Sequence, residues 1–317
     1  MTFKLQQVSS DTVDLRSLAW DLDVAPEAIS DFYAQQVVHN TGVPPVVIGS
    51  TRGARGGPVF IDFRSEGAPC FSICQGYKIA AKHAYRNGVI VVTQAFDILT
   101  QSPGSDPVLW DTSGVNKMTP ILGAQLAVDG AQLVVPCRIQ GRTALVQLTL
   151  NDSAKTAMVT AQPNLNGADF PNGAETPPYV DRVALSGGRL FIQTCGRQTR
   201  PRTGFPFGVI AEITPDAQVS KRLHWHDYGA ETDGKPRGFG GRFTTSGRYF
   251  LHNGTYKTTD PWRGEQIAFD LESRDFHAFG PNQALSGVAI FDHAMDMWWG
   301  ISTLAPHTVR FHRYRAA

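Results

Sequence analysis

The chain has 317 residues and a formal net charge of +1 from 29 basic and 28 acidic side chains, and charged residues make up only 18% of it. A charge so near zero argues against nucleic acid or an anionic membrane as the main partner. The 31 glycines and 20 prolines are typical of all-β proteins with many short strands.

The N-terminal stretch MTFKLQQVSSDTVDL (1–15) has no apolar core of the kind found in secretion signals. No run approaches the roughly 18 apolar residues of a spanning helix. We therefore expect a cytoplasmic protein, or one assembled into a particle. The four cysteines, Cys70, Cys74, Cys137 and Cys195, follow neither a zinc spacing nor a disulfide framework. The sequence also contains no phosphate-binding loop, dinucleotide-binding fingerprint or His-Glu-x-x-His motif, and no cofactor is predicted.

A short hairpin recurs along the chain. In each copy an apolar strand meets a tight turn, usually with a glycine, and an alternating apolar strand follows. Asn-Gly and Asp-Gly pairs suit the positive φ angles of such turns. The copies are VVHNTGVPPVVIG (37–49), AYRNGVIVVTQ (84–94), LAVDGAQLVVPC (126–137), ALSGGRLFIQTCG (184–196), FTTSGRYFLHNG (243–254) and IFDHAMDMWWGIS (290–302). Repeats of about 40–60 residues indicate blades or solenoid units.

A second hairpin follows almost every copy of the first, as in PVFIDFRSEGAPCFSI (58–73) and QIAFDLESRDFHAF (266–279). Four strands per repeat are the plan of a β-propeller blade. The sequence therefore predicts one propeller domain over 1–317, most simply with six blades. The predicted units are 31–75, 76–119, 120–163, 178–229, 237–281 and 284–317.

The last unit lacks its outer strand. The alternating segment FKLQQVS (3–9) can supply it, which would close the ring and remove both open sheet edges. Residues 1–30 are thus predicted to be a closing strand and an extension. An alternative stays open, because residues 23–36 also read as a helix with Pro26 in its first turn. The ring would then have five blades plus an N-terminal extension.

Antiparallel strands reverse at each turn, so the connections of a blade divide between two faces. First-to-second and third-to-fourth turns lie on one face, which we call the turn face. Second-to-third connections and links between blades lie on the other, which we call the loop face. The sequence places its long segments on the loop face: 50–58, 96–107, 196–207 and 253–265, with links 163–178 and 227–238. Long loops on a rigid scaffold often carry function.

Arginine and aromatic residues gather in these segments, and such side chains suit protein or glycan contacts. The predicted partner-binding residues are Arg52, Arg55, Arg197, Arg200, Arg202, Arg237, Tyr256 and Trp262. If the protein were an enzyme, the candidate catalytic carboxylates would be Asp31, Asp181, Glu175 and Glu231, near the mouth of the axial channel. His224 and His226 would share one side of a strand, as metal ligands can, but no third ligand is evident.

No catalytic motif with a characteristic spacing occurs in the chain. The leading hypothesis is a non-catalytic propeller that binds a protein partner, another copy of itself or a glycan through its loop face, as part of a larger assembly such as a virion or a surface complex. The alternative is a carbohydrate-active hydrolase or lyase, which would need paired carboxylates.

Overall fold

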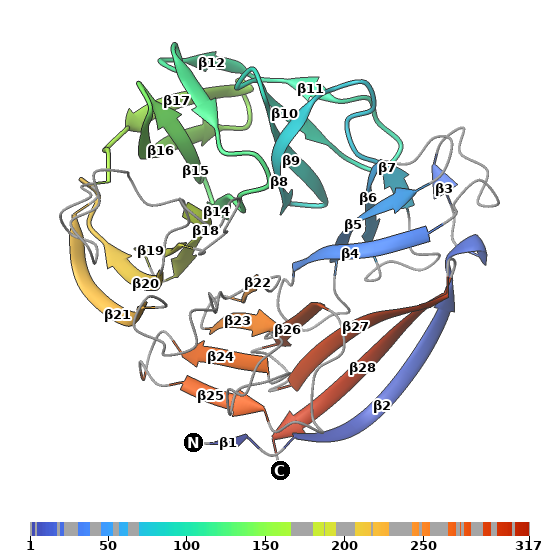
Figure 1. The fold of residues 1–317 in the computed structure, drawn as a ribbon. Helices are drawn as coiled ribbons and strands as arrows, with labels where there is room; N and C mark the ends of the chain where they lie inside the picture. The colour runs from blue at the N-terminus through green and yellow to red at the C-terminus, as the bar shows by residue number, and fades with distance from the viewer. Residues whose placement is uncertain are drawn as a thin grey trace.

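A computed structural model describes the strands of every predicted unit. The described residues are 2–3, 5–17, 20–21, 31–38, 46–52, 57–62, 70–165, 180–186, 188–194, 207–216, 218–227, 243–246, 249–253, 266–270, 273, 276–279, 288–292, 297–305 and 308–316. Within these ranges the strands form six sheets, one in each predicted unit. The sheets stand around a common centre like the blades of a propeller (Figure 1), which confirms the predicted all-β propeller fold; the number of blades stays a prediction.

In the first three sheets the strands lie in the following spatial order. Sheet 1 is β3 (Trp20–Asp21), β7 (Cys70–Ser72), β6 (Pro58–Asp62), β5 (Val46–Arg52) and β4 (Asp31–Val38). Sheet 2 is β11 (Val108–Leu109), β10 (Ile98–Gln101), β9 (Gly88–Thr93) and β8 (Ile79–Tyr85). Sheet 3 is β12 (Asp111–Ser113), β17 (Thr156–Ala161), β16 (Arg142–Asn151), β15 (Gln132–Ile139) and β13 (Met118–Pro120), with β14 (Ala127–Asp129) also on β15.

The other three sheets follow the same plan. Sheet 4 is β18 (Val180–Ser186), β19 (Arg189–Thr194), β20 (Phe207–Ile213) and β21 (Val219–Asp227). Sheet 5 is β1 (Thr2–Phe3), β25 (Phe276–Phe279), β24 (Gln266–Asp270), β23 (Tyr249–Asn253) and β22 (Phe243–Ser246). Sheet 6 is β2 (Leu5–Asp14), β28 (Thr308–Ala316), β27 (Met297–Ala305) and β26 (Val288–Asp292).

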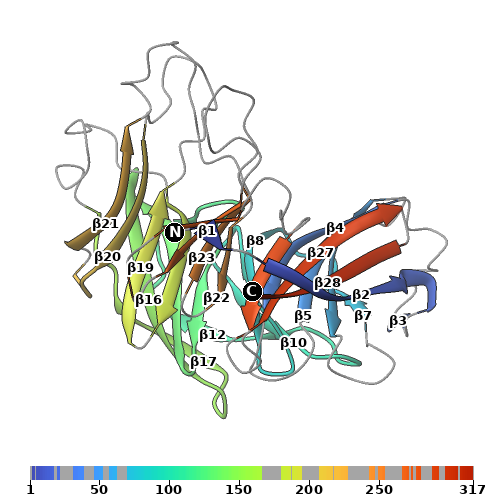
Figure 2. The same cartoon turned by 90° about the horizontal axis from the view of Figure 1, so that it is seen from below.

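The N-terminal segment joins three sheets at their outer edges. β1 pairs in parallel with β25, β2 pairs antiparallel with β28, and β3 pairs in parallel with β7. Figure 2 shows β2 lying along β28 near the end of the chain. The predicted closing strand is therefore confirmed, and it is longer than the expected 3–9. A one-turn 3-10 helix, Leu15–Ser17, follows β2. In the described part of the chain, no helix has the length and apolar content needed to span a bilayer.

The alternative helix over 23–36 is wrong for residues 31–36, because these belong to β4 and pair with β5. Residues 23–30 lie outside the described residues.

Two other expectations need correction. The segment 96–107 is not one long loop, because β10 lies inside it and only 102–107 connects β10 to β11. The stretch PVLWDTSGVNKM (107–118), which reads as the second hairpin of the second unit, does not form a simple outer hairpin there. β11 stays in sheet 2, whereas β12 pairs in parallel with the outer strand of sheet 3 and β13 pairs with β15. The link between sheets 2 and 3 therefore supplies strands to both edges of sheet 3.

Apolar side chains fill the spaces between neighbouring sheets. Alternate residues of β9 show this: Ile90 and Val92 pack toward sheet 3, whereas Val89 and Val91 pack toward sheet 1. Because both faces of a blade are covered, the inner strands read as continuous apolar runs. A third cluster, which includes Leu145, Leu190 and Ile213, lies between sheets 3 and 4.

Gly88 is required by a close approach of two strands. A Cβ at this position would lie 2.0 Å from the carbonyl oxygen of Gln101 and 2.9 Å from the carbonyl carbon. By contrast, a Cβ on Gly57, in front of β6, would meet no atom within 4 Å. A substitution at Gly88 would thus force β9 and β10 apart.

We expect Gly88→Ala to destabilise the protein by about 2 kcal/mol or more, since overpacking against backbone typically costs about 1–3 kcal/mol. Gly57→Ala is the control and should leave the melting temperature close to wild type. Thermal unfolding of both variants measures the effect, and equal melting temperatures would contradict this account of β9 and β10.

A polar cluster on the turn face links sheets 2 and 3. The Tyr85 hydroxyl donates to Asp152 Oδ2 at 2.6 Å, Lys155 Nζ lies 3.2 Å from Asp152 Oδ1, and Arg86 also pairs with this carboxylate. Lys155 Nζ lies 5.1 Å from the centre of the Trp110 ring. Burial alone would raise the pKa of Asp152, but the hydrogen bonds from Tyr85 and Lys155 and the charges of Arg86 and Lys155 outweigh it and lower that pKa.

Because the folded-state pKa of Asp152 lies below its ordinary value of 3.8, its stabilising contribution is present above about pH 4 and is lost as the pH falls through the folded pKa. Asp152→Asn should therefore unfold about 1 kcal/mol more easily at neutral pH. The difference from wild type should shrink at lower pH. Denaturant unfolding across this pH range tests it, with Asp129→Asn as the control; a difference that stays constant would refute the assignment.

Candidate functional site

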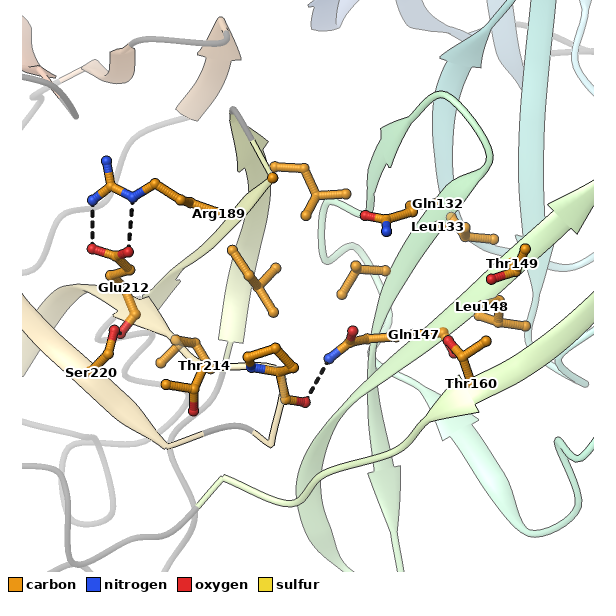
Figure 3. A pocket seen from close by; sticks show the side chains of 16 residues that line it. Gln132, Leu133, Gln147, Leu148, Thr149, Thr160, Arg189, Glu212, Thr214 and Ser220 are labelled. Carbon is orange, nitrogen blue, oxygen red and sulfur yellow. Dashed lines mark hydrogen bonds and ion pairs between the residues drawn. The ribbon is translucent and has the colours of Figure 1, made fainter.

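A groove of about 350 Å³ lies between sheets 3 and 4. Figure 3 shows its side chains, contributed by β15, β16 and β17 on one wall and by the β18–β19 hairpin, β20 and the start of β21 on the other. The lining residues are Gln132, Leu133, Val134, Gln147, Leu148, Thr149, Thr160, Leu185, Gly188, Arg189, Leu190, Glu212, Ile213, Thr214, Pro215 and Ser220. The volume is at the lower end of the range of small-ligand sites.

The wall from sheet 3 presents amides and hydroxyls beside the buried aliphatic side chain of Val134. Gln132 and Thr149 are register partners on β15 and β16, and both are exposed. Gln147 lies two residues before Thr149, so it shares the same side of β16. Its Nε2 donates to the Pro215 carbonyl oxygen at 2.9 Å and joins the two sheets (Figure 3). The Thr160 hydroxyl donates to the Gln147 carbonyl oxygen at 3.2 Å.

The wall from sheet 4 is aliphatic where it meets the core, and Thr214 and Ser220 add hydroxyls at its edge. Leu190 and Ile213 are register partners on β19 and β20, both are buried, and both belong to the cluster between sheets 3 and 4. Leu185 packs against that cluster and is partly exposed. The groove is therefore the place where the core between the two sheets ends. One wall can contact apolar groups and the other can form hydrogen bonds.

The charged residues of the groove turn away from its interior. Arg189 donates to Glu212 through Nε at 2.8 Å and through Nη2 at 2.5 Å, and its guanidinium carbon lies 4.9 Å from the centre of the Phe191 ring. Glu212 is the register partner of Phe191, so this trio lies on the side of sheet 4 opposite to Leu190 and Ile213. Figure 3 shows both charged side chains pointing away from Gln132 and Gln147. The interior of the groove is thus electrically neutral.

The groove opens near the β18–β19 turn and the 214–218 turn, which are a first-to-second and a third-to-fourth connection. It therefore lies on the turn face rather than on the predicted loop face. Sequence reasoning missed it, although β16 carries a signal. Its side toward sheet 4 reads Thr143, Leu145, Gln147, Thr149. The change from leucine to polar residues marks the end of the core.

Of the four predicted catalytic carboxylates, two lie in described strands. Asp31 is the first residue of β4 and the register partner of Arg52, the last residue of β5. Asp181 lies near the start of β18, at a shift of register between Val180 and Arg182. Both positions are at the loop-face ends of inner strands, but they belong to different sheets. Glu175 and Glu231 lie outside the described residues.

Most of the predicted partner-binding residues also lie outside the described residues: Arg55, Arg197, Arg200, Arg202, Arg237, Tyr256 and Trp262. His224 and His226 lie on β21 opposite Ile210 and Gly208, at alternate positions as expected. Among the residues that the structure describes, no group of three potential metal ligands comes together.

No protein-family model and no curated protein matches the chain. Among solved structures, the Trypanosoma rangeli sialidase in complex with the inhibitor DANA aligns with a TM-score of 0.53 at 10% identity, over 96% of this chain and 59% of that one. Oligogalacturonate lyase from Vibrio parahaemolyticus aligns at 0.47 and 6% identity, over 99% and 97% of the chains. The β-propeller domain of Cps50 (Swd1) from Myceliophteria thermophila aligns at 0.44 and 11%, over 91% and 99%.

Identities this low show the fold alone. The similar structures include two proteins named as enzymes and a propeller domain named without an activity. Likeness of this kind leaves function to the chemistry of the sites on the fold.

Proposed function

We propose that this protein is a non-catalytic binding module, and that the groove between sheets 3 and 4 holds a neutral segment of a protein partner. The observation that carries the proposal is the division of the groove into an aliphatic wall (Leu185, Leu190) and an amide and hydroxyl wall (Gln132, Thr149). A module of this kind suits a component of a larger assembly, such as a virion or a surface complex.

The walls fit a peptide better than a sugar. A peptide offers backbone N–H and C=O groups to Gln132 and Thr149 and can place an aliphatic side chain against Leu185 and Leu190. Sugar rings usually stack on aromatic faces, and the described residues that line this groove include no aromatic side chain. A charged ligand would lose hydration without meeting a free countercharge, because the Arg189 guanidinium already contacts Glu212.

The alternative of a carbohydrate-active enzyme rests on Asp181. A change of register at a strand start often occurs beside active sites, where it re-aims a side chain, and the register of β18 shifts at this residue. This hypothesis needs a second carboxylate, for which Asp31, Glu175 and Glu231 are the candidates. The test is to measure hydrolysis of a panel of oligosaccharides. Activity that Asp181→Asn loses and Thr149→Arg keeps would favour the enzyme over the binding module.

To test the groove, a library of random displayed peptides is selected for binding to the wild-type protein. A peptide enriched in the selection is then synthesised, and its affinity is measured by calorimetry. Thr149→Arg places a long cation in the groove from an exposed position, so it should preserve folding. Leu109→Arg is the matched control, since Leu109 is an exposed strand residue of sheet 2.

We expect the selected peptides to be neutral and to contain an aliphatic residue. Thr149→Arg should bind them about tenfold more weakly than wild type, which corresponds to about 1.4 kcal/mol. Leu109→Arg should bind them as tightly as wild type. Selection of no peptide, or equal binding by all three proteins, would disprove the proposal. Glycan-array binding that Thr149→Arg abolishes would assign the groove to a sugar instead.

A further inference from the structure

The loop-face end of sheet 3 carries three cations in a small space. Arg138 and Arg142 flank the tight turn Gln140–Gly141 between β15 and β16. Lys117 directly precedes β13, whose first residue, Met118, pairs with Ile139. Lys117 therefore lies beside the same turn. These three residues are called the basic tip.

We propose that the basic tip docks a carboxylate-rich segment of a partner protein. This surface is distinct from the groove, which opens on the opposite face, but the proposal rests on the role of the protein as a binding module. The loop face is also where the sequence placed its predicted partner-binding arginines.

The charges of the basic tip are available to a partner. Lys117, Arg138 and Arg142 are all exposed. None of the described carboxylates forms an ion pair with any of them, whereas Arg86, Lys155 and Arg189 each contact one. With a net charge of only +1 for the chain, attraction for an anion is local to this tip rather than a property of the whole molecule.

The backbone beneath the basic tip is rigid. Pairing of β15 with β16 runs without a break from Gln132 opposite Thr149 to Ile139 opposite Arg142. The turn holds Gln140 and Gly141 at φ 50° and 80°. A second turn, closed by Met118 N–H donating to the Val115 carbonyl oxygen at 3.2 Å, holds Lys117 at φ 66°. Because these positions are fixed before binding, less conformational entropy is lost when a partner docks.

The geometry favours separate carboxylates over a linear polyanion. Arg142 is opposite Ile139 and Arg138 is opposite Thr143, so successive side chains leave opposite sides of the sheet. The two guanidinium groups therefore flank the tip from both sides, and each can grip one carboxylate in a two-pronged contact. A nucleic acid or a sulfated polysaccharide is normally bound by cations set along a line or stripe.

The test measures fluorescence anisotropy of a labelled glutamate-rich peptide with the full-length protein, at low salt and at about 0.15 M salt. The variants are Arg142→Glu and Arg138→Glu/Arg142→Glu. Arg315→Glu is the matched control, because Arg315 is also an exposed arginine near a strand end. Circular dichroism checks that each variant is folded.

We expect saturable binding that weakens with salt, at least tenfold weaker binding for the double variant and an intermediate loss for Arg142→Glu. Arg315→Glu and the groove variant Thr149→Arg should bind within about twofold of wild type, which separates this proposal from the one about the groove. No binding at low salt, or an equal loss in Arg315→Glu, would overturn it. Tighter binding of heparin through the same arginines would replace the protein partner by a sulfated glycan.

Discussion

Closure of the ring depends on the pairing of β2 with β28. Without β2, the outer edge of sheet 6 would expose the backbone of a nine-residue strand (β28). Such an edge is a template for pairing with other chains. The same N-terminal segment also reaches sheet 5 through β1 and sheet 1 through β3. One stretch of chain thus pairs with the outer strands of three neighbouring sheets.

The groove follows from how the sheets pack. The space between two neighbouring sheets is filled by apolar side chains only where the facing strands carry apolar residues at alternate positions. On the side of β16 that faces sheet 4, the apolar residues end before Gln147. Gln147 is half-buried at this point, and its amide donates to the Pro215 carbonyl oxygen. Beyond this bridge the polar wall meets solvent. The groove is therefore the place where the core between sheets 3 and 4 ends, and the residues of β16 set that end.

Much of the fold could be predicted because each hairpin carries its own local signal. The turns at Asn87-Gly88 and Asp129-Gly130 lie where β8 meets β9 and close to where β14 meets β15. Local signals failed where a strand pairs outside its own repeat. Residues 111–113 are not distinctive as a strand, and only tertiary pairing with Thr156–Met158 makes them one.

The candidate site was harder to predict than the fold. Loop length pointed to the loop face, whereas the groove arises from two sheets that are adjacent in space, and no single segment encodes it. Gln132, Gln147 and Thr149 look ordinary in their own strands. They matter only because Leu185 and Leu190 of the next sheet lie opposite them. Asp31 and Arg52 likewise lie opposite each other only because of the register between β4 and β5.

The clasp between the two ends of the chain also constrains the order of events during synthesis. β2 leaves the ribosome first among the strands of sheet 6, and its partner β28 leaves last. β2 must therefore remain without its partner in sheet 6 until β28 has been made. Contacts of such long sequence separation form slowly. A chain that lacks β28 therefore leaves β2 without its sheet, and unpaired strand edges favour aggregation.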